Sequence, residues 1–75
     1  MSRMPQVTAR EVLRFLEKNG FVVARKSGAH VTLTHSSRSD IVTVPVHKGH
    51  DLGRGLAVRI LKDAGFSVED FLKRR

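Results

Sequence analysis

The feature that most constrains the fold is a glycine turn between two short runs of strand-forming residues. The first run, residues 21–26, is rich in valine and is followed by Ser27-Gly28. The second run, residues 31–34, alternates apolar and polar side chains, as a strand with one buried face does. The two runs predict an antiparallel hairpin. A third strand is predicted over residues 41–46, where Pro45 lacks an amide donor and should end it.

Helical patterns flank this three-stranded meander on both sides. Apolar side chains recur at helical spacing over residues 9–19 and again over residues 54–64, so we predict a helix over each. Capping boxes are predicted at Thr8 and Ser67, each followed three residues later by a carboxylate, and the second box starts a short helix at Val68. Burying these stripes predicts an α+β protein, with helices on one face of a three-stranded antiparallel sheet.

Length and composition limit the classes of function. With 75 residues we expect one domain over residues 1–75, with a thin core. The net charge of +7 favours an anionic partner, such as nucleic acid or an acidic protein. The chain has no cysteine, and no apolar run approaches the roughly 20 residues of a membrane span. We therefore expect a cytoplasmic protein without a membrane segment, and the sequence leaves its oligomeric state open.

One histidine, His30, stands where the second strand of the hairpin starts. Side chains alternate along a strand, so His30 lies on the face opposite Val31 and Leu33. If those two side chains pack against the helices, the imidazole projects from the open face of the sheet. Histidine changes charge near neutral pH, so an exposed imidazole can donate and accept protons. The plainer interpretation is that His30 only begins a strand.

Three segments, residues 20–30, 41–47 and 60–67, resemble in order and spacing the HicA toxins of bacterial and archaeal toxin–antitoxin pairs. The resemblance extends from about Val7 to Leu72. HicA toxins are messenger-RNA interferases, so it implies an αβββα fold like that of double-stranded-RNA-binding domains. It also implies an endoribonuclease that cleaves mRNA without a metal or other cofactor. The implied protein partner is a HicB-like antitoxin that neutralises the toxin.

The same resemblance points to site residues. Gly28-Ala29-His30 occupies the place of the family's glycine, serine and catalytic histidine, which makes His30 the candidate catalytic residue. Arg25 and Lys26, just before the turn, are candidate RNA contacts together with Gly28. The alternative for the two cations is an ordinary solvated hairpin tip. Alanine in place of the usual serine removes a hydroxyl and puts activity in question.

His47 ends the second family segment and, with Lys48, is a candidate RNA contact or a second acid or base. More often such a residue only caps a loop. We do not predict a metal site at His47 and His50, because two histidines without cysteine or a carboxylate cluster make a weak ligand set. Leu56 also departs from the family, where threonine usually follows the glycine that begins the second helix.

Two further features are predicted to be structural. His35 ends the second strand with the parity of the buried residues, which favours a partly buried or loop-facing ring. Lys73-Arg74-Arg75 is expected to form a frayed, solvated terminus rather than a phosphate contact.

Two other functional classes are compatible with the sequence. A non-catalytic RNA-binding module of the same fold would grip phosphates and 2′-hydroxyls and would need no histidine. A protein-interaction domain would use its basic surface for an acidic partner. Intact RNA after long incubation would favour the first class, and failure to bind RNA even at low salt would favour the second.

Overall fold

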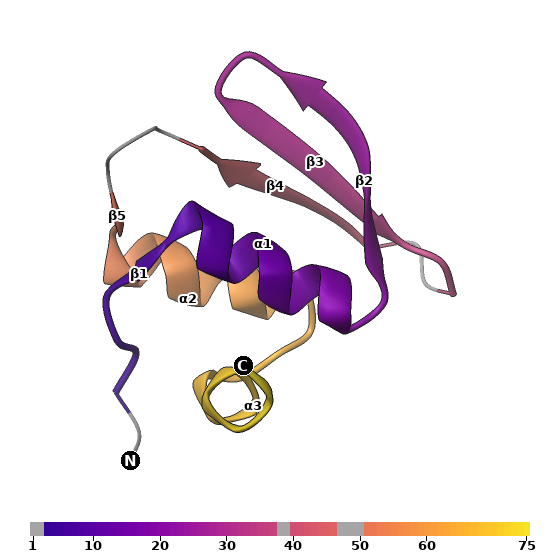
Figure 1. The fold of residues 1–75 in the computed structure, drawn as a ribbon. Helices are drawn as coiled ribbons and strands as arrows, with labels where there is room; N and C mark the ends of the chain where they lie inside the picture. Colours follow the sequence, from indigo (N-terminus) through magenta and orange to yellow (C-terminus); the bar gives the residue numbers. More distant parts are fainter. Residues whose placement is uncertain (1–2, 38–39, 47–50) are drawn as a thin grey trace.

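A computed structural model describes residues 3–37, 40–46 and 51–75. Its elements are, in chain order, β1 (Val7–Thr8), α1 (Ala9–Lys18), β2 (Phe21–Ser27), β3 (His30–His35), β4 (Ile41–Pro45), β5 (Asp51–Leu52), α2 (Arg54–Asp63) and α3 (Val68–Arg74). Figure 1 shows α1 and α2 below the same face of the three-stranded sheet, with α3 farther from the sheet than either. The predicted α+β class and αβββα order are confirmed.

The three-stranded sheet has the predicted meander topology. Its strand order is β2-β3-β4, and both neighbouring pairs are antiparallel. Pro45 is the last residue of the edge strand β4, as its missing amide requires. A separate two-stranded ladder pairs β1 with β5 and brings Val7 opposite Leu52. This ladder was not predicted, because strands of two residues are too short to show alternation.

The helices begin and end close to the predicted residues. α1 ends one residue before the predicted boundary, with Asn19 as its C-cap, and α2 ends likewise, with Ala64 as its C-cap. Differences of one residue are normal at frayed helix ends. Both helices have ten residues, and no helix in the described ranges is long and apolar enough to cross a membrane.

The two predicted capping boxes differ in the structure. At α3 the box is complete, because Ser67 and Asp70 exchange both backbone-to-side-chain hydrogen bonds. The donation from the Ser67 backbone N–H is the main reason that the pKa of Asp70 lies below its ordinary value. At α1 only half forms: the Thr8 hydroxyl accepts from the Glu11 N–H at 3.2 Å. The Glu11 carboxylate accepts from the Thr8 hydroxyl instead of the Thr8 amide.

The core lies between the sheet and the helices. On the central strand Val31 is 8% exposed and Leu33 is 0% exposed, and on β4 Val42 and Val44 are equally well buried. From the helical side, Phe15 packs edge-to-face against Phe66 and Phe71, with ring centroids 5.0 Å apart in each pair. Alternate residues of β3 and β4 are therefore buried, as predicted for β3, and their neighbours form the opposite face, whereas on β2 only Phe21 is buried.

His35 connects the far end of the sheet to the end of α1. Its ring meets Phe21 edge-on at 5.0 Å, and its Nδ1 accepts a hydrogen bond from the Ser37 backbone N–H at 3.1 Å. Gly20 follows α1 with a φ of +96°, and a β-carbon there would lie 2.5 Å from Nε2 of His35. The predicted partly buried, structural placement of His35 is confirmed.

The basic residues at the end of α3 are more ordered than predicted. The Arg74 guanidinium donates a hydrogen bond to Oδ1 of Asn19 at 3.1 Å and lies 5.8 Å from the centroid of the Phe66 ring. Asn19 is itself oriented, because its side-chain amide donates to the Phe15 carbonyl at 2.7 Å. The expectation of a frayed terminus is therefore wrong for Arg74, which is tied to the C-cap of α1.

Candidate catalytic face of the sheet

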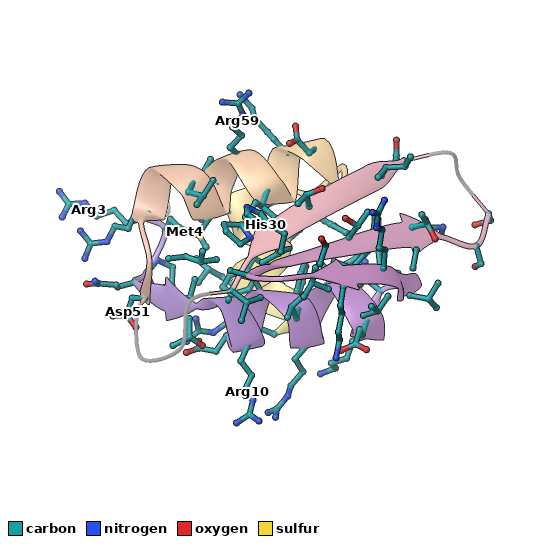
Figure 2. The ribbon with its side chains drawn as sticks, turned by 90° about the horizontal axis from the view of Figure 1, so that it is seen from above. Arg3, Met4, Arg10, His30, Asp51 and Arg59 are labelled. Carbon is teal, nitrogen blue, oxygen red and sulfur yellow. The ribbon has the colours of Figure 1, made fainter. Side chains whose placement is uncertain are left out.

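The face of the sheet that points away from the helices carries the candidate site. His30 lies on this face and is exposed, because Val31 and Leu33 on either side of Thr32 are buried against the helices. The prediction from strand alternation is thereby confirmed. Figure 2 views the sheet from this side, with His30 labelled. The face consists of three cross-strand rows: Ser27, His30 and Pro45; Arg25, Thr32 and Thr43; Val22, Thr34 and Ile41.

A β-bulge at Ala24 decides which side chains of β2 share the face with His30. Val23 pairs with Leu33 and Arg25 pairs with the adjacent Thr32, so Ala24 between them has no partner on β3. Strict alternation from the buried Phe21 would turn Arg25 toward the helices, but the bulge places Arg25 opposite Thr32. Arg25 is therefore the diagonal neighbour of His30. Diagonal neighbours lie about 7–8 Å apart, so a guanidinium and an imidazole can reach the same phosphodiester.

Lys26, the second predicted cation, lies on the other face. It is opposite Val31, whose side chain points toward the helices. The Lys26 side chain is nevertheless exposed. The structure thus brings Arg25 together with His30 and separates Lys26 from both.

The turn that precedes His30 depends on the backbone conformation of Gly28 and on one hydrogen bond to the residue after β4. Gly28 has a φ of +57°, and a β-carbon added there would have no atom within 4 Å. Its backbone conformation, rather than lack of space, is what favours glycine at this position. The Val46 N–H donates to the Ala29 carbonyl, which fastens the turn to the end of β4. The candidate RNA contacts His47 and Lys48 lie outside the described residues.

Four hydroxyl side chains lie on this face, and none was predicted as a site residue; three of them, Ser27, Thr32 and Thr43, are in the rows of His30 and Arg25, and Thr34 is in the row beyond. Ser27 lies directly opposite His30, and Thr32 and Thr43 form the next row with Arg25. Thr43 could have been found from the sequence, because its neighbours in β4 alternate with it as apolar residues. Ser27 could not, because the bulge sets its face. Hydroxyl groups donate hydrogen bonds to phosphate oxygens and so suit an RNA backbone.

The chemistry available on this face combines one proton-transfer group with one fixed positive charge. His30 can act as a general acid or base, and Arg25 can stabilise negative charge on a phosphorus centre. The three rows contain no carboxylate that would repel a phosphodiester. Among the described residues, no three histidine, aspartate or glutamate side chains gather as a possible metal-ligand set.

Comparison with protein families identifies the chain. The family model described as the HicA toxin of bacterial toxin-antitoxin matches residues 9–66, which is more than half of the sequence. This chain belongs to the HicA toxin family. No individually curated protein matches it. The HicA match runs from the first residue of α1 to the segment before α3, so it includes the whole open face and His30.

Membership of the HicA family makes the protein a toxin of a toxin–antitoxin pair, with an antitoxin as its partner. The resemblance seen in three segments of the sequence is confirmed at the level of the family. The roles of His30, Arg25, Lys26, Gly28, His47 and Lys48 stay predictions.

Proposed function

We propose that this HicA protein is an endoribonuclease that cleaves messenger RNA on the open face of its sheet, with His30 as the general acid or base. The observation that carries the proposal is the exposed imidazole of His30, placed diagonally to Arg25 on a face that the helices leave uncovered. The family's toxin role and the net charge of +7 support the proposal. The protein would act in the cytoplasm, where messenger RNA is translated.

The proposed reaction starts at a ribose 2′-hydroxyl. His30 accepts the hydroxyl proton while the oxygen attacks the adjacent phosphorus, and the bond from phosphorus to the 5′ oxygen breaks. The leaving 5′ oxygen takes up a proton from solvent water, His30 returns its proton to the solvent, and the products carry a 2′,3′-cyclic phosphate and a 5′-hydroxyl. Proton transfer of this kind contributes about 10²–10⁴-fold to the rate. Arg25 and the hydroxyls of Ser27, Thr32 and Thr43 would stabilise the charge that develops on the phosphorane.

The proposed means of neutralisation is a HicB-like antitoxin that covers this face. Because the toxin is strongly basic, the antitoxin should present an acidic surface of complementary shape. An antitoxin segment lying over His30 would exclude RNA by steric overlap. No further change in the toxin is needed.

The function is tested with a defined RNA and its 2′-deoxy counterpart, each incubated with the pure protein and a chelator. We expect cleavage of the RNA into fragments that end in 2′,3′-cyclic phosphate, and no cleavage of the deoxy strand. Equal cleavage of both strands would contradict the 2′-hydroxyl route and favour water as the nucleophile.

The second candidate function is a non-catalytic RNA-binding module. Arg25 and the three hydroxyls can hold phosphates and 2′-hydroxyls without any proton transfer, and Ala29 departs from the serine usual in the family. RNA that stays intact while it binds in a salt-sensitive manner would support this function and exclude the nuclease.

A further inference from the structure

A basic groove lies on the helical side of the molecule, between α1 and the end of α3. It has a volume of about 290 Å³, and its lining includes Arg10, Arg14, Lys18, Arg75, Phe15 and Phe71. Figure 1 shows α3 on the far side of α1 from the sheet, and Figure 2 shows Arg10 extending from α1 away from the strands. The groove therefore lies apart from the face that carries His30.

Positive charge lines both walls of this groove. Arg10, Arg14 and Lys18 recur every four residues on α1 and form an exposed row about 12 Å long. Within the described part of the chain, none of these three side chains is in an ion pair. On the other wall, the Arg75 guanidinium lies 5.4 Å from the centroid of the Phe71 ring, and the Arg75 N–H donates to the Phe71 carbonyl at 3.0 Å.

The bottom of the groove is apolar. Phe15 and Phe71 pack edge-to-face beneath it and are each only 1% exposed, so the aliphatic stems of the arginines and the lysine supply most of its accessible apolar surface. One carboxylate, that of Glu11, also lines the groove and accepts a hydrogen bond from the Thr8 hydroxyl. The groove thus offers cations at its rim, an apolar floor and one acceptor.

This combination favours a protein segment over a nucleic acid. A phosphodiester backbone carries a negative charge at every nucleotide, so it would be repelled by Glu11 and would leave the apolar floor uncovered. A protein segment can place carboxylates against the cations, one apolar side chain against the aliphatic stems that lie over Phe15 and Phe71, and a donor against Glu11.

We propose that this groove, the α1–α3 groove, is a docking site for an acidic segment of the antitoxin that carries one apolar anchor residue. The antitoxin would then hold the toxin on its helical side as well as over His30. The proposal rests on membership of a toxin–antitoxin family and not on RNA cleavage, so the failure of either is seen separately.

The test is a titration of the ¹⁵N-labelled protein with a synthetic helical peptide, monitored by NMR. The peptide carries glutamate at every fourth position and a single phenylalanine between two of the glutamates. We expect shifts in the amides of α1 and of the last turn of α3, and none in β3 and β4. We also expect Arg14→Glu to weaken binding about tenfold or more.

The matched control is Arg59→Glu, which makes the same charge change at an exposed position of α2 that Figure 2 shows pointing away from the sheet. It should weaken binding by less than about threefold, through net charge alone. Equal weakening by both variants would overturn the proposal, because it would show general charge attraction. If Arg14→Glu fails to fold by circular dichroism, Arg14→Gln replaces it, with Arg59→Gln as its control.

Two further arms test the chemistry of the occupant. A peptide with alanine in place of phenylalanine should bind more weakly, and unchanged affinity would contradict a role for the apolar floor. A single-stranded RNA that shifts the groove amides more strongly than the peptide would assign the groove to nucleic acid and overturn the proposal.

Discussion

The two faces of the three-stranded sheet differ most on β3 and β4, where residues packed against the helices alternate with residues on the open face. On the central strand, Val31 and Leu33 are buried against the helices, whereas His30, between the turn and Val31, is open to solvent. On β4, Thr43 is exposed between the buried Val42 and Val44. Stability and the proposed chemistry thus lie on opposite sides of one layer, and substitutions should affect them separately.

The largest effect is expected on the helix-facing side. Leu33→Ala should lower the free energy of unfolding by about 2–5 kcal/mol, because it leaves a cavity at a position that is 0% exposed. Thr43→Ala, on the exposed face of the neighbouring strand, should change it by less than about 0.5 kcal/mol. Urea unfolding measures both. Similar decreases in the free energy of unfolding for the two variants would contradict the claim that the helix-facing side carries the stability.

The next effect separates two adjacent cations of β2. Arg25→Ala should slow RNA cleavage about tenfold to a hundredfold, because it removes charge stabilisation beside His30. Lys26→Ala removes the same charge from the other face and should slow cleavage less than about threefold. Initial rates on one RNA, at one salt concentration, give the comparison. If Lys26→Ala slowed cleavage more than Arg25→Ala, the site would not be on the face to which the strand register assigns Arg25.

A smaller effect distinguishes the two glycines that flank β2. Gly20→Ala should cost about 1–2 kcal/mol, since its φ of +96° disfavours a side chain and the new methyl would meet the His35 ring. Gly28→Ala should cost less, because the space around it is open. Thermal or urea unfolding would show the order. The reverse order would mean that the turn before His30 is the more constrained end.

The smallest effect is expected at α3, which lies outside both faces. The lowered pKa of Asp70 means that its ionised form stabilises the folded protein above pH of about 4, and that this stabilisation is lost as the pH falls through the lower folded-state pKa. Asp70→Ala should therefore lose less stability than the wild type on acidification. Urea unfolding at about pH 5 and about pH 3 tests this. Equal losses would exclude a contribution from the capping box.

Burial made the helix-facing side of the sheet predictable from the sequence. Val31 and Leu33 had to lie on one face, and this placed His30 on the other without any knowledge of the fold. The helices followed from apolar periodicity and from the capping residues at their starts. Strand alternation, helical periodicity and capping residues each involve several positions at regular spacing, so they can be recognised in the sequence.

The parts that could not be predicted depend on single residues or on distant contacts. One extra residue, Ala24, decides that Arg25 and not Lys26 joins His30, and nothing in an alternation pattern marks a bulge. The order of Arg74 depends on Asn19, which is 55 positions away in the chain. The pairing of β1 with β5 is likewise too short to leave a periodic signal.

The most direct test of the central claim is the cleavage rate of His30→Ala on a defined RNA. Because His30 is exposed and is not part of the hydrophobic core, the variant should keep the circular dichroism spectrum and the urea midpoint of the wild type. Its cleavage rate should fall by about 10²–10⁴-fold. A folded His30→Ala protein that cleaves RNA at the wild-type rate would contradict the claim that the open face of the sheet acts through this imidazole.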